Sequence, residues 1–139
     1  MIVESYLFFN GRCEEAIEFY KKALAAEVLM LMRFKDQPPA KSGTCGPPPG
    51  AELKIMHAAL RIGETTVMMS DGRCEGEPKF EGIALSLAVA NDAQAAKAFN
   101  ALSEGGKVVM PLGKTFYSSS FGMVNDRFGV MWMVIVPQN

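Results

Sequence analysis

Residues 54–71 read KIMHAALRIGETTVMMSD, and this stretch sets the plan of the chain. Apolar and polar residues alternate on both sides of Gly63-Glu64, and the second half is rich in β-branched residues. A short turn that contains glycine, placed between two such runs, is typical of a β-hairpin. The stretch therefore predicts two antiparallel strands, over 54–62 and 65–71.

The segments before the hairpin predict a strand, a helix and a second strand. VESYLFFNG (3–11) alternates and ends at a turn-forming Asn-Gly pair, and EVLMLMRF (27–34) also has the composition of a strand. In CEEAIEFYKKALAAEV (13–28) apolar residues recur every three or four positions, with acids first and bases last, which predicts a helix. Five prolines and three glycines in residues 37–50 predict a long loop, either a functional lid or a variable insertion.

The second half of the chain repeats this order. We expect a strand over 82–90, a helix over 92–106 with Asp92 as its N-cap, a strand over 107–112 and a hairpin over 116–126 and 130–136. A shift of about 80 residues pairs equivalent positions: Leu7 with Leu87, Ala16 with Ala96, Phe19 with Phe99, Val28 with Val108, and Met30 with Met110. The prediction is a single α+β domain over 1–139, made of two βαβββ modules (1–72 and 81–139) and a polar linker, 73–80.

Composition excludes several classes of protein. The chain has 139 residues, of which 49% are hydrophobic and 21% charged, and a net charge of −1 without a basic stripe, so we expect no nucleic-acid partner. No apolar run approaches the ~20 residues of a membrane span, and the N-terminus lacks the basic region of a signal peptide. Cys13, Cys45 and Cys74 are odd in number and widely spaced, which favours three reduced thiols and a cytoplasmic location.

The repeated plan carries motifs of a known family. AIEFYKKAL (16–24), HAALRIGETTVMMSD (57–71) and FGMVNDRFGVMWM (121–133) resemble the vicinal oxygen chelate superfamily, which includes glyoxalase I, bleomycin resistance proteins and dihydroxybiphenyl dioxygenase. The resemblance covers essentially the whole chain and is closest to the PhnB-like branch. It implies cupped mixed sheets with helices on the outer face. Some relatives in that branch are labelled demethylubiquinone methyltransferases, but this sequence has no Gly-rich strand-to-helix turn for a nucleotide-like cofactor.

The resemblance also implies a metal held in the cup by His and Glu side chains, and the matching positions test this. They are occupied here by Ser5, Gly82 and Met133, although the turn from Asp126 to Gly129 is kept. A serine hydroxyl, a glycine hydrogen and a thioether are a poor donor set for a divalent first-row metal. We therefore predict no metal at that position and no cofactor.

His57 is the single histidine of the chain. Three roles stay open for it: a half-buried side chain hydrogen-bonded within the sheet, a contact to a ligand, or a catalytic base. A metal site around His57 would need Glu64, Asp71 or Cys74 to converge on it. Hydrolysis by a Ser-His pair is disfavoured, because no orienting acid and no G-x-S-x-G turn is present.

The strand period of two predicts which residues line the cup. We expect the inward set to contain Leu7 and Phe9 with Ser5, Ala84 and Ser86 with Gly82, and Met131 and Ile135 with Met133. The faces of Met56, Met68, Met69, Met123 and Trp132 stay uncertain by one residue. Hydroxyls of Tyr117–Ser120 would orient a ligand, and Arg33 and Arg61 either receive an anion or are solvated. The predicted ligand pocket consists of Ser5, Leu7, His57, Met69, Gly82, Ala84, Tyr117, Ser119, Met131 and Met133.

Three functions compete. The first is a metal-free protein that binds a small hydrophobic or aromatic ligand in a methionine-lined cavity. The second is a glyoxalase-type lyase or isomerase with a non-standard metal site or none, and with His57 as base. The third is a structural or regulatory dimer whose cups are filled by their own side chains, and the ten methionines then simply pack the core. An uncovered sheet face predicts either a homodimer or closure of the two modules on each other.

Overall fold

The structure is a computed structural model that describes residues 1–37, 49–72 and 76–138. The chain divides into two compact units, Met1–Pro78 and Lys79–Asn139, with the boundary inside the predicted linker. The described residues form two helices and eight strands in two mixed four-stranded sheets, which confirms the α+β prediction. Most of the predicted proline-rich loop, and also Cys45 and Cys74, lie outside the described residues.

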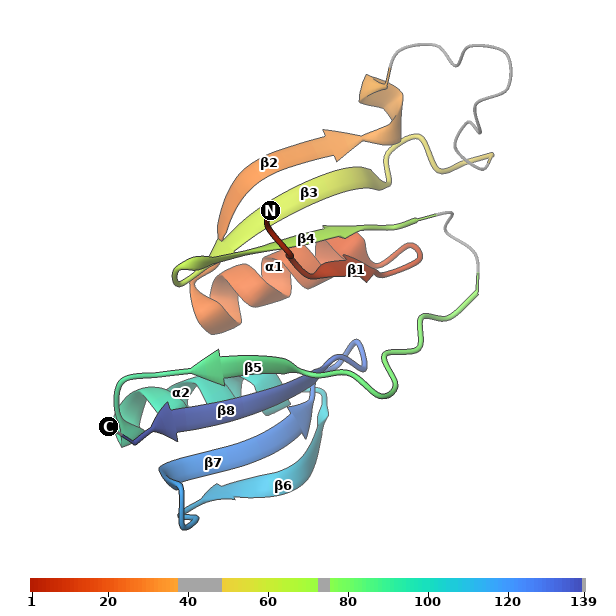
Figure 1. Cartoon of the computed structure of the whole chain (residues 1–139). Coiled ribbons are helices and arrows are strands. Elements are labelled where there is room, and N and C mark those ends of the chain that lie inside the picture. Colours follow the sequence, from red (N-terminus) through yellow and green to blue (C-terminus); the bar gives the residue numbers. More distant parts are fainter. Residues whose placement is uncertain (38–48, 73–75, 139) are drawn as a thin grey trace. The chain divides into compact units, whose positions relative to one another are not determined.

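The first unit has the order that the sequence predicts (Figure 1). Its elements are β1 (Tyr6–Phe8), α1 (Cys13–Leu24), β2 (Glu27–Arg33), a short 3-10 helix η1 (Phe34–Asp36), β3 (Ile55–Ile62) and β4 (Thr65–Ser70). The strands lie in the order β1-β4-β3-β2, with β1 parallel to β4 and the other pairs antiparallel. The hairpin of residues 54–71 is thus confirmed, and β1 joins it at its far edge.

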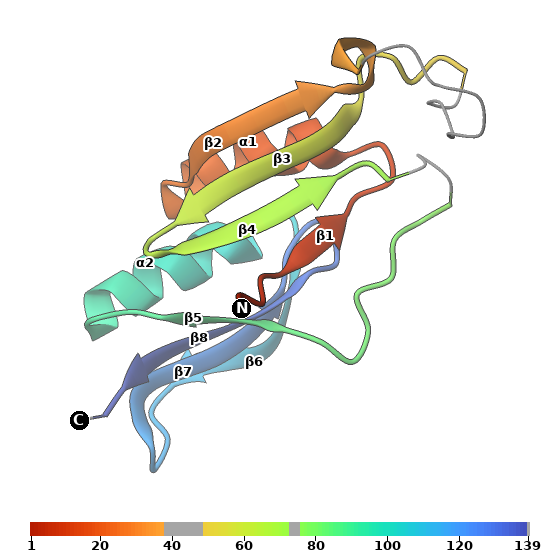
Figure 2. The same ribbon diagram turned by 45° about the horizontal axis from the view of Figure 1, so that its top comes forward.

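The second unit repeats this arrangement. Its elements are β5 (Leu85–Ala88), α2 (Asp92–Ser103), β6 (Lys107–Gly113), β7 (Ser118–Asn125) and β8 (Met131–Pro137), in the sheet order β5-β8-β7-β6. Strand β5 is parallel to β8, while β6-β7 and β7-β8 are antiparallel. In each unit the helix lies against one face of its own sheet (Figure 2). Neither helix has the length and apolar content needed to cross a bilayer within the described residues.

The two units also share an irregularity in the pairing of their edge strands, β2 and β6. The pairing of β2 with β3 shifts between Val28 and Met30, and the pairing of β6 with β7 shifts between Val108 and Met110. These positions are the ones that the sequence offset pairs. The same bulge therefore occurs at the same place in both units.

Burial separates the two faces of each sheet. On β3, Ala58, Leu60 and Ile62 are buried, whereas the alternating Ala59 and Arg61 are less so. On β7 a side chain at Gly122 would meet Phe99 of α2, so Gly122 lies on the side of the helix. We call the side that packs on the helix the helix face, and the opposite side the open face.

The pairing register corrects three expected orientations in the first unit. Leu7 pairs with Met69, which pairs with Ala58, so Leu7 and Met69 lie on the helix face, and they are buried. Phe9, two residues after Leu7, is buried as well. The expected inward set was therefore wrong by one residue along β1, and the aromatic side chains of Tyr6 and Phe8 occupy the open face instead.

Three helix ends also differ from the expectation. Helix α2 ends at Ser103, three residues before the predicted end at 106. Asn91, not Asp92, is the N-cap of α2, because its side chain accepts a hydrogen bond from the Gln94 amide. Helix α1 ends at Leu24 because Ala25 adopts a left-handed conformation, with φ of 53°. The predicted helix, 13–28, was therefore four residues too long.

Candidate functional site

The open face of the first sheet gathers aromatic rings and thioethers. The register places Tyr6 beside Met68, Met68 beside Ala59, and His57 beside Met32 of the edge strand. Most of these side chains are half-buried, and Phe8 is 52% exposed. This face therefore offers a partly exposed apolar surface with few polar groups, of the composition that small-molecule sites use. Its members are Tyr6, Phe8, Met30, Met32, His57, Ala59 and Met68.

His57 is held by a residue that is 51 positions away in the sequence. The Tyr6 hydroxyl lies 2.9 Å from Nδ1 of His57, and the two rings stack with centroids 5.6 Å apart. Strand β4 runs between their strands, so the Tyr6 ring reaches across β4 to make this contact. Nε2 of His57 makes no hydrogen bond with any residue that the structure describes. The imidazole is thus fixed at one nitrogen and available at the other.

Phe8 is positioned by the end of β4. Its ring centroid lies 4.9 Å from that of Tyr6, and a Cβ on Gly72 would come within 3.1 Å of its Cδ1. Gly72 has φ of 57°, a conformation that favours glycine. The close approach of this glycine leaves room for the Phe8 ring beside Tyr6.

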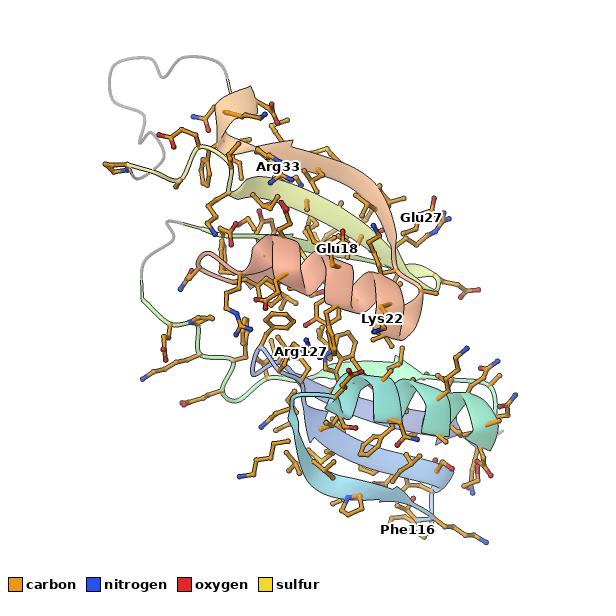
Figure 3. The ribbon with its side chains drawn as sticks, turned by 180° about the vertical axis from the view of Figure 1, so that it is seen from behind. Glu18, Lys22, Glu27, Arg33, Phe116 and Arg127 are labelled. Carbon is orange, nitrogen blue, oxygen red and sulfur yellow. The ribbon has the colours of Figure 1, made fainter. Side chains whose placement is uncertain are left out.

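The two arginines that could receive an anion are already engaged. Arg61 forms an ion pair with Glu27, and Arg33 forms one with Glu14 and donates a hydrogen bond to the carbonyl of Leu53. Figure 3 labels Arg33 and Glu27 at opposite ends of β2. A free anion would have to displace a carboxylate at either arginine.

Asp71 is a structural group and does not converge with His57 on a metal. Its buried carboxylate accepts hydrogen bonds from the amides of Gly11 and Cys13 at the start of α1 and from the amide of Ile55. It therefore connects β4, β3 and the first helix. Glu64 lies in the exposed turn between β3 and β4, and Cys74 lies outside the described residues.

Cys13 is the free cysteine within the described residues, and it is fully buried. Burial raises the pKa of its thiol far above the ordinary value, and the negative charges of Asp71 and Glu14 raise it further. The thiol is therefore neutral and a poor nucleophile or metal ligand.

The open face of the second sheet is rich in methionine. Met131, Met133 and Ile135 are half-buried and pair with Asn125, Met123 and Phe121 of β7, in agreement with the expected inward set. Ser86 and Ala88 of β5 share this face, and Ala84 precedes them. Trp132 instead lies on the helix face, where its indole N–H donates to Oδ2 of Asp126. Asp126 also accepts from the amides of Phe128 and Val130 and so shapes the turn.

The serines of the 117–120 run are hydrogen-bonded within the second unit. Ser118 is fully buried, with its hydroxyl 2.7 Å from the carbonyls of Ser120 and Val136. The hydroxyls of Ser119 and Ser120 both donate to Oδ1 of Asp92, which lowers the pKa of that carboxyl. Tyr117 precedes β7, is 41% exposed and contacts the rings of Phe116 and Phe121.

The three positions that the resemblance assigns to a metal have no donors of the usual kind, and Ser5, two residues before Leu7, also shares the corrected face of Leu7 and not the open face. The backbone carbonyl of Ser5 is occupied by the Met68 amide, Gly82 lies in an exposed turn with φ of 73°, and Met133 offers a thioether. Across 1–37, 49–72 and 76–138, no group of three or more His, Cys, Asp or Glu side chains is arranged to hold an ion. The residues at these positions do not fit a first-row metal.

The sequence reasoning missed five members of the open face: Tyr6 and Phe8 of β1, Met30 and Met32 of β2, and Ala59 of β3. Tyr6 and Phe8 alternate with Leu7, and the 80-residue offset pairs Leu7 with Leu87, which lies on the helix face of β5. If the 80-residue offset had also been used to assign faces, Leu7 would have been assigned to the helix face, as Leu87 is. Tyr6 and Phe8 would then have been assigned to the cup.

Comparison with known proteins gives the family. The model of a family described as 3-demethylubiquinone-9 3-methyltransferase matches residues 2–135. The chain belongs to this family. It is 33% identical over 140 residues to protein YjdN of Escherichia coli, an alignment that covers 98% of this chain and 95% of YjdN.

Solved structures agree with this assignment. Protein PA1353 of Pseudomonas aeruginosa is 41% identical, with a TM-score of 0.85 over 100% of this chain and 99% of that one. The PhnB protein of Bacillus cereus is 25% identical, with a TM-score of 0.78 over 98% and 99% of the two chains. A glyoxalase/bleomycin resistance protein/dioxygenase domain shares the fold. The chain is thus similar to a PhnB protein in sequence and structure, and it shares the fold of glyoxalase/bleomycin resistance/dioxygenase proteins.

Proposed function

We propose that the chain is a small-molecule-binding protein that works without a metal at the superfamily position. The observation that carries the proposal is the open face of the first sheet. Its Phe8, Tyr6, His57 and methionine side chains are half-buried or exposed, and the unit itself does not cover them. Thioethers adapt to varied apolar shapes and aromatic rings stack on planar ones, so this face suits small, carbon-rich molecules.

A binding screen tests this proposal. A ligand that binds only the folded protein raises its melting temperature, so a library of small aromatic compounds should contain members that do so. Phe8→Ala should abolish the shift. Leu53→Ala is the matched control, because Leu53 is a large exposed hydrophobic residue, 64% exposed, outside the open face. A library without any stabilising compound, or shifts that survive Phe8→Ala, would contradict the proposal.

The metal content of the purified protein tests the metal-free part of the proposal separately. Untagged protein purified without chelator should contain far less than one first-row metal ion per chain by mass spectrometry of the elements. The donor set at Ser5, Gly82 and Met133 gives the reason. Stoichiometric metal would overturn this part and favour a glyoxalase-type reaction.

The methyltransferase activity in the family's description is not part of the proposal. Nucleotide-like cofactors bind where backbone amides at a strand-to-helix turn are free to receive them. Here the amides of Gly11 and Cys13 donate to the Asp71 carboxylate, and the Gln94 amide of α2 donates to Asn91. Both turns are therefore closed by the protein's own side chains.

We also propose that two copies of the chain associate. The edge strands β2 and β6 expose the apolar triplets Leu29–Leu31 and Val108–Met110, each side chain between 38% and 48% exposed. A second copy is the commonest cover for such edges. Sedimentation equilibrium should give twice the chain mass, and Met30→Lys with Met110→Lys should lower it. A monomer in the unaltered protein, or dissociation by Leu53→Lys as well, would contradict this proposal.

A further inference from the structure

The hydrogen bond between Tyr6 and His57 can run in either direction, and its direction decides the tautomer of the imidazole. A neutral imidazole carries one proton, and the bond made at one ring nitrogen determines which nitrogen holds it. The phenol is a good donor through its O–H, and an unprotonated imidazole nitrogen is a better acceptor than a phenol oxygen. On this ground Tyr6 is assigned as the donor to Nδ1 of His57 across the 2.9 Å contact, which places the ring proton on Nε2.

This direction makes Nε2–H a donor that the described residues do not satisfy. The ring is half-buried, with Met32 beside it on β2 and the Tyr6 ring stacked against it. Because no fully buried side-chain nitrogen or oxygen of the described residues lacks a partner, Nε2–H is open to solvent, and an acceptor on a ligand would replace a water there. The open face thus favours a molecule that brings an acceptor to this point.

The neighbouring rings indicate what the rest of that molecule is. Phe8, Tyr6 and His57 form a row, with centroid separations of 4.9 Å and 5.6 Å. Phe8 is 52% exposed, so part of its ring is available for contact. Separations in this range are those at which aromatic rings attract one another.

We infer that the open face of the first sheet selects planar aromatic molecules that carry a hydrogen-bond acceptor, such as an aryl ketone. The acceptor takes the proton of His57 Nε2–H, and the aromatic ring packs on Phe8 and Tyr6. The ring of Tyr6 contacts the ligand directly, while its hydroxyl group positions His57. The inference rests on the proposed function and names the ligand class of that site.

The first test needs no ligand. His57 is the sole histidine, so nitrogen-15 NMR of a labelled sample gives one imidazole spectrum. At an alkaline pH that keeps the ring neutral, the spectrum should show a protonated Nε2 and an unprotonated Nδ1. Tyr6→Phe should reduce this preference, and Tyr117→Phe, which removes a hydroxyl from the second unit, should not. A protonated Nδ1 in the unaltered protein would overturn the inference.

The second test compares acetophenone with α-methylstyrene, in which a CH2 group replaces the carbonyl oxygen. Acetophenone should bind roughly fivefold more tightly, as expected for one additional hydrogen bond, and should move the Nε2 resonance. His57→Phe should remove the difference while α-methylstyrene still binds, and Tyr117→Phe should keep it. Equal binding of both compounds with an unmoved Nε2 would refute the ligand class but leave the proposed function standing. Binding of neither compound would refute this inference, whereas the library screen decides the proposed function separately.

Discussion

A methyl group added at Gly122 of β7 would lie 2.7 Å from Cε2 of Phe99 on α2. The same group would come within 3.0 Å of the Leu112 Cα atom on β6. Because the helix and the neighbouring strand both approach this position, neither side can yield freely. We expect Gly122→Ala to lower the free energy of unfolding by about 1–3 kcal/mol. Urea unfolding followed by the fluorescence of Trp132, the single tryptophan and a buried residue of the same unit, measures this.

Gly113→Ala is the matched control for that change. A Cβ at Gly113 would have one neighbour, at 4.0 Å, and Gly113 is not among the glycines with positive φ. We expect Gly113→Ala to change the free energy of unfolding by less than about 0.5 kcal/mol. Phe99→Leu in the Gly122→Ala background should recover part of the loss. Equal effects at Gly122 and Gly113 would contradict the close approach.

Asp71→Asn should destabilise the first unit. The carboxylate accepts three backbone hydrogen bonds, and an amide in its place turns one acceptor atom into a donor. Hydrogen bonds to a buried charge contribute roughly 1.5–3 kcal/mol each, so we expect a loss of at least that size. Thermal unfolding followed by circular dichroism measures it. Asp36→Asn, at an exposed carboxylate that accepts one amide bond, should cost much less, and a similar loss at both sites would refute the role of Asp71.

Cys13 should be unreactive in the folded protein. Burial raises the pKa of its thiol, so at neutral pH the reactive thiolate is absent and the sulfur is shielded. In a Cys45→Ser, Cys74→Ser background, iodoacetamide should label Cys13 only after denaturant is added. Because the pKa is raised in the folded state, the stabilising effect is present below the ordinary value of 9.0 and is lost as the pH rises above it. Cys13→Ala should remove that alkaline loss of stability, and rapid labelling in native buffer would contradict the burial.

Asp92 should titrate below its ordinary pKa of 3.8. Hydrogen bonds from Ser119 and Ser120 stabilise the carboxylate, so the stability that they provide is present above 3.8 and is lost as the pH falls through the folded value. Ser119→Ala with Ser120→Ala should raise the pKa, as measured by carbon-13 NMR of the Asp92 carboxyl group. Ser103→Ala, which removes a hydroxyl bonded to the Asn100 carbonyl, should leave it unchanged. An equal shift in both variants would show that the serines are not the cause.

Local patterns predicted most of the fold. The alternation in 54–71 and its glycine turn gave β3 and β4 to within one residue, and the 80-residue offset gave the second unit. The errors lie at the ends of the elements, where the backbone conformation of a single residue decides whether a helix continues. Nothing in the composition of 13–28 shows that Ala25 is left-handed, and two neighbouring acceptors, Asn91 and Asp92, compete for one cap.

The candidate site was less predictable, because it depends on pairing between distant strands. Strand β1 joins the sheet by a parallel contact with β4, and β1 is three residues long, so one slip inverts the faces of Leu7 and Tyr6. The contact of Tyr6 with His57 spans 51 residues and crosses a strand, and no local pattern encodes it. On β8, which is seven residues long and pairs along most of its length, the expected set of Met131, Met133 and Ile135 shares one face, whereas the face of Trp132 was left open.

The bulges at Leu29 and Val109 bear on how far self-association can proceed. A straight, apolar outer strand would accept copy after copy in register and so build a fibre. An inserted residue bends the strand and breaks the regular row of donors and acceptors that such growth requires. The edge strand of each unit is thus apolar but irregular, which disfavours open-ended addition of strands and is compatible with the closed dimer proposed above.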